Sequence, residues 1–115
     1  MEPGRAGKSM SELRRGIIVF CVLALLDVRE RYAVELVSDL AASETLAAGQ
    51  GTIYPLLSRL RSDGLVSTTW QESPSGPPRR YYRLTESGAA ALVAFRGEWT
   101  QFRDAVDDLL LEGRT

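Results

Sequence analysis

The sequence predicts a mainly helical α+β domain, with three helices, then a two-stranded hairpin, then one long helix. Apolar residues recur at helical spacing in three separate segments ahead of residue 64. Two segments rich in aromatic and β-branched residues then flank a proline-rich stretch, as strands flank the loop of a hairpin, and a fourth helical pattern follows. A chain of 115 residues can bury only one modest core, so we expect these elements to form a single domain.

The first helix is expected to begin at Ser9, after a flexible arm of residues 1–8. Ser9 and Glu12 have the spacing of a capping box. Every residue from 17 to 26 is apolar, so this helix should be covered on all sides, and one face is expected to meet a partner chain. The same run is about half the length of a membrane span and charged residues flank it. We therefore expect a cytoplasmic protein with neither a signal peptide nor a membrane segment.

Two shorter helices are expected next. The stripe that predicts the second helix consists of Ala33, Leu36, Val37 and Leu40. The stripe that predicts the third helix consists of Ile53, Leu56, Leu57 and Leu60. Because proline is best tolerated in a first turn, Pro55 places the start of the third helix near Gly51 or Thr52, and Gly64 is expected to end it.

A hairpin with a long tip is expected after the third helix. Strands are predicted over 65–72 and 79–84, and the connecting SPSGPP at 73–78 has the composition of a loop. Thr85 and Glu86 then have the pattern of a helix start, in which a hydroxyl cap precedes an acid.

This order of elements is that of a winged helix-turn-helix, in which the third helix enters the major groove of DNA. The apolar stripe of that helix leaves polar side chains on its other faces, which can bond to phosphates and base edges. Arginines that follow the proline-rich loop can reach the adjacent backbone or minor groove. The DNA-binding residues predicted on this basis are Thr52, Tyr54, Ser58, Arg59, Arg61, Arg79 and Arg80.

Charge is divided along the chain in a way that fits this interpretation. Residues 50–85 hold five arginines and two acids, a net charge of +3, although the whole chain carries −1. Residues 86–115 hold six acids and three arginines, a net charge of −3. A basic central segment followed by an acidic C-terminal segment is typical of a protein that binds an anionic polymer, such as DNA, through one segment only.

The last helix is expected to form a dimer seam. Its apolar residues alternate at spacings of three and four, which is the a/d pattern of a helix pair. A helix over 85–112 would be about 42 Å long, which is longer than a domain of this size can cover. The interface residues predicted here and on the first helix are Ile18, Val22, Leu92, Phe95, Trp99, Phe102, Val106 and Leu109.

Three of these interface residues are large flat groups: Phe95, Trp99 and Phe102. Near a two-fold axis they could line a pocket for a planar aromatic effector. The simpler interpretation is that they only pack the interface, and the two alternatives predict different responses of Trp99 fluorescence to aromatic compounds.

Residue types that enzymes need are scarce in this chain. It has no histidine and one cysteine, Cys21, which lies in the apolar run of the first helix. Nucleophile–histidine pairs and most zinc sites are thereby excluded. We therefore expect neither an enzyme, nor a metal site, nor a cofactor.

Two segments together closely resemble the PadR family of transcriptional regulators: GTIYPLLSRL at 51–60 and RRYYRLT at 79–85. The segment YAVEL at 32–36 is similar to the family's second helix, although a glycine often found beside the tyrosine is replaced. The resemblance implies a homodimer that binds double-stranded DNA at a palindromic operator, usually as a repressor and often released by a small molecule. It also implies that Thr52, Tyr54 and Pro55 form the DNA-facing helix start. The single helix after the wing is typical of the short branch of the family.

The predicted organisation is thus an arm over 1–8, a winged helix-turn-helix over 9–85, a dimerisation helix over 86–112 and a tail over 113–115. The main alternative keeps this fold but uses it for protein–protein assembly without DNA, because fold alone does not fix function. A neighbouring family of winged-helix DNA-binding proteins is a further alternative, and an enzyme is the remotest.

Overall fold

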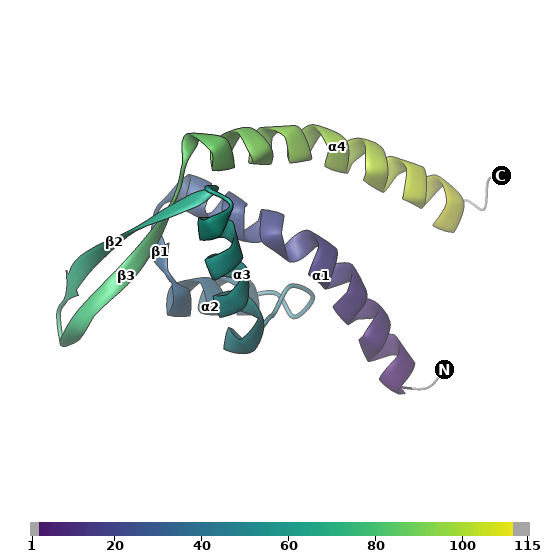
Figure 1. Cartoon of the computed structure of the whole chain (residues 1–115). Coiled ribbons are helices and arrows are strands. Elements are labelled where there is room, and N and C mark those ends of the chain that lie inside the picture. The colour runs from purple at the N-terminus through teal and green to yellow at the C-terminus, as the bar shows by residue number, and fades with distance from the viewer. Residues whose placement is uncertain (1–2, 112–115) are drawn as a thin grey trace.

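A computed structural model describes residues 3–111, with side chains from residue 9 onward. The elements are, in chain order, α1 (Pro3–Val28), β1 (Arg31–Tyr32), α2 (Ala33–Ala41), α3 (Gln50–Ser62), β2 (Val66–Ser73), β3 (Gly76–Leu84) and α4 (Glu86–Leu110). Figure 1 shows α2, α3 and the sheet gathered at one end, from which α1 and α4 extend. The predicted fold class is confirmed, with its wing and its long last helix. Residue 112 and the predicted tail over 113–115 lie outside the described residues.

The core lies where α1, α2 and α3 meet the sheet. The largest fully buried side chains are Val22, Leu23, Leu36, Ile53, Leu57 and Leu60. The stripes that predicted α2 and α3 therefore face inward. Full burial of one such side chain contributes about 1.5–3 kcal/mol, so the stripe of α3 holds that helix to the body and leaves its opposite face free.

Helix α1 is longer than predicted. It begins at Pro3, so Ser9 lies inside the helix and the prediction of a start at Ser9 is wrong. Residues 3–8 of the predicted arm belong to this helix. Two physical facts explain the difference: proline fits the first turn of a helix, and residues three apart, such as Ser9 and Glu12, also neighbour each other within a helix.

The sheet has a third strand that the sequence did not reveal. Strand β1 consists of Arg31 and Tyr32 and pairs with β3 opposite Tyr82 and Tyr81, in the strand order β1-β3-β2. Two residues are too few to show the alternation by which strands are recognised. The consequence is that the segment between α1 and α2 is bonded directly to the wing.

The second strand of the hairpin is longer than predicted, the first is shifted by one residue, and the tip of the hairpin is short. Strand β2 runs to Ser73 and β3 begins at Gly76, so the expected loop at 73–78 is mostly strand. The register shifts between Gln71 and Ser73, where two prolines of β3 stand opposite one residue of β2. Proline has no N–H to donate and is tolerated at a bulge and at a sheet edge, which explains how these prolines fit into a strand.

The junction between α3 and α4 is tightly bonded. Gly64 has a φ of 76°, and the amide of Leu65 donates to the carbonyl of Leu60, so α3 ends in the predicted glycine cap. The Thr85 hydroxyl accepts from the amide of Gly88 and donates to the carbonyl of Gly64. A Cβ at Gly88 would lie 2.1 Å from the carbonyl oxygen of Leu65, so α4 begins in contact with the end of α3.

Candidate nucleic-acid interface

Helix α3 presents a polar face to solvent. All the residues predicted on this helix to contact DNA are exposed, and Tyr54 keeps 44% of its surface. They comprise Thr52, Tyr54, Pro55, Ser58, Arg59 and Arg61. Between them lie the buried Ile53, Leu56, Leu57 and Leu60. One face of α3 thus anchors the helix while the other offers hydroxyls and guanidinium groups.

The exposed face begins earlier than the sequence suggested. Gly49 caps the helix, whose first residue is Gln50, and the amides of Thr52 and Ile53 both donate to the Gly49 carbonyl. The predicted start near Gly51 or Thr52 is therefore too late, and Pro55 lies beyond the first turn, where it deprives one carbonyl of its donor. Gln50 joins the exposed N-terminal end of α3.

The two wing arginines lie on opposite faces of the hairpin. Successive side chains of a strand alternate between faces, so Arg79 shares the outer face with Tyr81, and Arg80 shares the inner face with Tyr82. The Cζ atom of Arg79 lies 4.5 Å from the centroid of the Tyr32 ring. The Cζ atom of Arg80 lies 5.0 Å from the centroid of the Trp70 ring. Both distances fit cation–π contacts.

The inner face of the wing and helix α3 enclose a polar cleft of about 320 Å³. Its lining residues are Ser58, Arg61, Ser62, Arg80 and Tyr82. No ion pair joins Arg61 or Arg80 to a carboxylate within residues 9–111. The cleft therefore concentrates positive charge beside the exposed face of α3.

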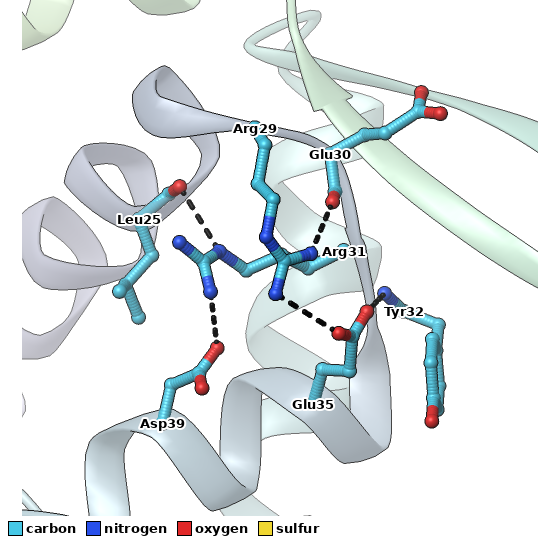
Figure 2. Close-up of polar contacts among 7 residues, drawn as sticks. All are labelled: Leu25, Arg29, Glu30, Arg31, Tyr32, Glu35 and Asp39. Atoms are coloured by element: carbon cyan, nitrogen blue, oxygen red, sulfur yellow. Dashed lines mark hydrogen bonds and ion pairs between the residues drawn. The ribbon is translucent and has the colours of Figure 1, made fainter.

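A network of polar contacts joins α1, β1 and α2, as Figure 2 shows. The guanidinium of Arg31 donates to the carbonyl of Leu25 at 3.1 Å and to Asp39 at 2.6 Å, and Arg31 is only 8% exposed. Arg29 donates to Glu35 at 3.1 Å, and this hydrogen bond raises the pKa of Arg29. Glu35 also accepts from the amide of Tyr32, so the chain between α1 and α2 is held at several points.

The same segment reaches the outer face of the wing. The Gln71 side chain donates to Glu30, and Tyr32 lies under Arg79 and edge-on to Tyr81. Two residues of the α1–α2 connection thus fix the wing from the side opposite to α3.

An apolar groove separates the free ends of α1 and α4. Close to the sheet, the Phe20 and Phe95 rings stack with centroids 3.8 Å apart, and Trp99 and Phe102 continue the row of rings along α4. The groove beyond has a volume of about 850 Å³ and is lined mainly by apolar side chains of both helices. Leu13 on α1 is 68% exposed and Phe102 on α4 is 65% exposed, so this apolar surface lies open in the single chain.

Three predicted interface residues belong instead to the protomer core. Ile18 is 3% exposed, Val22 is fully buried and Leu92 is 2% exposed. Ile18 and Val22 lie on the side of α1 away from Phe20, which faces α4, and all three residues are buried in the core of the single chain, so they do not belong to its open surface. Heptad spacing shows which side of a helix is apolar, but it does not distinguish an internal neighbour from a partner. Phe95, Trp99 and Val106 are partly buried, and Phe102 and Leu109 are exposed.

Three residues near the candidate interface were not predicted from the sequence. Gln50 was placed before the helix, and an earlier helix start would have included it. Trp70 is 65% exposed and stands opposite Arg80 in the strand register, a pairing visible only once the register is known. Tyr32 was assigned to the second helix, and its strand pairing has no local signal.

Among the residues that the structure describes, no three side chains of ligating type come together. Over the described residues, no helix combines the length and apolarity of a bilayer span. Cys21 is a free, half-buried thiol, and burial raises its pKa, so it is less nucleophilic than an exposed cysteine.

A helix that is anchored by one face, polar on the other and flanked by a basic hairpin defines the winged-helix class of DNA-binding proteins. The chain belongs to the PadR-like family of transcriptional regulators, whose sequence pattern it matches over residues 22–94. The resemblance stated from the sequence is thereby confirmed, and members of this family are regulators rather than enzymes.

Known structures and sequences agree with this assignment. A PadR family regulator from Eggerthella lenta is 36% identical, with a TM-score of 0.83 and 93% of each chain covered. A PadR-like regulator from Bacillus cereus is 31% identical, with a TM-score of 0.78 over 86% of this chain and 96% of the other. The transcriptional regulator Rv3488 of Mycobacterium tuberculosis is 42% identical over 62 residues, which are 54% of this chain and 50% of that protein.

Proposed function

We propose that this protein is a repressor that binds a palindromic operator in the cytoplasm as a homodimer. The observation that carries the proposal is the presence of two surfaces on one chain. One is the polar face of α3 beside the basic cleft, and the other is the apolar groove between α1 and α4. The polar and basic surface can bind DNA, and the apolar groove can bind another copy of the chain.

In the proposed complex the N-terminal half of α3 enters the major groove. Gln50, Thr52 and Tyr54 are exposed there and can bond to base edges. Arg59 and the arginines of the cleft neutralise phosphates. Arg79, which the sequence analysis predicted to contact DNA, also stacks on Tyr32, and in this proposal that contact supports the wing.

Dimerisation supplies the palindromic symmetry. The proposed seam consists of the open ends of α1 and α4, where Leu13, Phe102 and Leu109 expose more than half of their surface. Burying such side chains against a partner gains about 25 cal/mol per Å² of apolar area. For the two copies of α3 to enter successive major grooves, the seam must set them about 34 Å apart.

A planar aromatic effector is the third part of the proposal. Phe95, Trp99 and Phe102 form a row of rings along the groove, with neighbouring centroids 6.0 and 6.5 Å apart. A flat molecule that lies against this row would change the angle between α1 and α4 in the dimer, and so the spacing of the recognition helices.

The test is selection of bound duplexes from a random pool by the purified protein, with its oligomeric state measured in parallel. We expect an inverted repeat bound by a dimer. A folded protein that enriches no sequence above background at low salt would overturn the proposal and favour an assembly module. Trp99 emission that ignores a broad panel of planar aromatic compounds would overturn the effector alone.

A further inference from the structure

We propose that Glu30 and Tyr32 are positioning residues for DNA binding, which hold the wing at the angle to α3 that an operator requires. Both lie in the connector, the segment of residues 29–32 between α1 and α2. Their side chains contact the outer face of the wing, which is turned away from α3. The inference rests on the proposed DNA-binding function and adds the part of the molecule that sets the orientation of the wing.

The outer part of the wing needs support beyond its own strands. Strand β1 pairs with β3 opposite Tyr82 and Tyr81. Nearer the tip, β3 is paired with β2 alone among the described residues. A hairpin of two strands is marginally stable in water, so backbone pairing by itself leaves the outer part of the wing free to bend. Arg79 and Arg80 both lie in this outer part.

The connector contacts the wing at exactly that level, on both of its strands. Gln71 of β2 and Arg79 of β3 stand opposite each other, at the last pair before the register shifts. The Gln71 side chain donates to the carboxylate of Glu30, and Figure 2 shows the Glu30 side chain pointing away from the rest of the connector. The Cζ atom of Arg79 lies 4.5 Å from the centroid of the Tyr32 ring. Each strand is thus held by a different residue of the connector.

The connector is itself fixed to the body of the domain. The guanidinium of Arg31 bonds to the Leu25 carbonyl of α1 and to Asp39 of α2. Glu35 of α2 accepts from the amide of Tyr32. Because the connector is bonded to both helices, its side chains are fixed points against which the wing is held, rather than mobile groups that would follow the wing.

The position of the outer face determines the position of the inner face. Arg80 is adjacent to Arg79 in β3, and it lines the polar cleft together with Arg61 of α3. A shift of the wing at Arg79 therefore changes the distance between Arg80 and α3. An operator that contacts both the wing and the recognition helix fits one such distance, so a loosened wing spends less time in the orientation that binds.

Two substitutions of Tyr32 test the ring. Tyr32→Leu removes the ring, and Tyr32→Phe keeps it. One exposed cation–π contact changes an equilibrium by about 2- to 5-fold, and the proposed dimer has two wings, so Kd for the selected operator should rise by about 4- to 25-fold in Tyr32→Leu. It should stay near the wild-type value in Tyr32→Phe. Equal losses in the two variants would assign the effect to the hydroxyl and overturn the role of the ring.

The salt dependence separates positioning from a direct contact with phosphates. Neither substitution of Tyr32 changes the charge of the chain. The slope of log K against log salt should therefore be the same in Tyr32→Leu as in the wild type, although the affinity is lower. A slope that becomes less steep in Tyr32→Leu would show that phosphate contacts are lost outright, and would overturn the proposal that the wing is only displaced.

Glu30 permits a test in which charge and position predict opposite signs. Removal of an acid normally strengthens binding to DNA, because it reduces repulsion of the phosphates. We expect Glu30→Ala to weaken operator binding nevertheless, whereas Glu30→Gln, which can still accept from Gln71, should not weaken it. The matched control is Glu72→Ala, which removes an exposed acid of β2 and should bind at least as tightly as the wild type. Equal or tighter binding by Glu30→Ala would overturn the role of Glu30.

Amide hydrogen exchange tests the wing in the absence of DNA. In Tyr32→Leu the amides of residues 71–80 should exchange faster than in the wild type, with exchange in α3 unchanged. Unchanged exchange in the wing would overturn the proposal whatever the binding data show. Faster exchange throughout the chain would show a general loss of stability, which overturns a positioning role for Tyr32; Glu30→Ala, measured in the same way, tests the second contact.

This inference and the proposed function fail in different ways. A wild type that binds the selected operator, with Tyr32→Leu and Glu30→Ala binding it equally tightly, would overturn the positioning role and leave the proposed function standing. A wild type that binds no duplex would overturn the proposed function and the role of the connector in it.

Discussion

The contact between Gly88 and Leu65 permits a sharp test of how α4 is tied to the DNA-binding elements. In the Gly88→Ala variant the new Cβ would lie 2.1 Å from the Leu65 carbonyl oxygen and 2.8 Å from Cδ1 of Leu84. A carbon and a carbonyl oxygen normally approach to about 3.3 Å, so the start of α4 has to move by about 1 Å. Beyond the buried Leu92, the Phe20–Phe95 stack joins α4 to α1 about 10 Å from residue 88, at 1.5 Å per residue.

That displacement is amplified along the helix. If α4 turns about the stack at Phe95, its far end at Leu110, about 22 Å beyond, moves by about 2–3 Å. Overpacking of this kind costs about 1–3 kcal/mol, or about 4 °C in Tm for each kcal/mol in a domain of this size. We expect a lower Tm and weaker binding to the operator, with a changed preference for half-site spacing.

The matched control is Gly97→Ala, in the same helix. A Cβ there meets nothing within 4 Å, and alanine favours a helix interior over glycine by about 0.5–1 kcal/mol. Its Tm should rise, at equal protein concentration, with operator binding unchanged. A Gly88→Ala variant that is as stable as Gly97→Ala would refute the close approach of α4 to the end of α3.

Three further predictions concern the recognition face, the groove and the part-buried ion pair between Arg31 and Asp39. Tyr54→Ala should weaken binding to the selected operator more than binding to random duplex, because Tyr54 is exposed at the base-reading end of α3; equal losses in a titration would remove it from base recognition. Phe102→Glu should dissociate the dimer in sedimentation experiments, since it places charge in the apolar groove, whereas Val93→Glu, exposed outside the groove, should not; a dimer that survives Phe102→Glu would contradict the proposed seam. Asp39→Asn should lower the unfolding free energy in urea by about 1–3 kcal/mol, because it leaves the buried Arg31 without its carboxylate. Asp104→Asn, which breaks an exposed pair with Arg103, should change the unfolding free energy by less than about 1 kcal/mol. Equal effects of the two variants would contradict a larger contribution of the Arg31–Asp39 pair to stability.

Local pattern predicted most of the DNA-binding domain. The stripe from Ile53 to Leu60 identified the buried side of α3, and the same pattern identified its exposed side. Gly64 and Thr85 marked helix ends correctly, because a left-handed residue and a hydroxyl cap are local requirements. The opposite faces of Arg79 and Arg80 also follow from strand alternation, but which of them faces α3 depends on the register with β2 and β1.

Features that depend on contacts between distant segments were predicted poorly. Strand β1 exists only because Arg31 and Tyr32 pair with β3. The two prolines of β3 fit into the sheet because the register shifts there, so that they stand opposite one residue of β2. Ile18, Val22 and Leu92 were assigned to a partner chain because an apolar helix surface has the same sequence pattern whether it is covered by the same chain or by a partner.

In the proposed dimer, a chain of contacts would connect the groove to the DNA-binding elements. Helix α4 is bonded to the end of α3 through Thr85 and the Gly64 carbonyl. Helix α1 is bonded to the wing through the next segment of chain, in which Arg31 holds the Leu25 carbonyl and Tyr32 holds Arg79. The two helices that line the groove are thus connected to α3 and the wing, the two elements that enclose the polar cleft. Because packed elements move as rigid bodies rather than deform, a change in the α1–α4 angle in the proposed dimer must reposition α3 and the wing together.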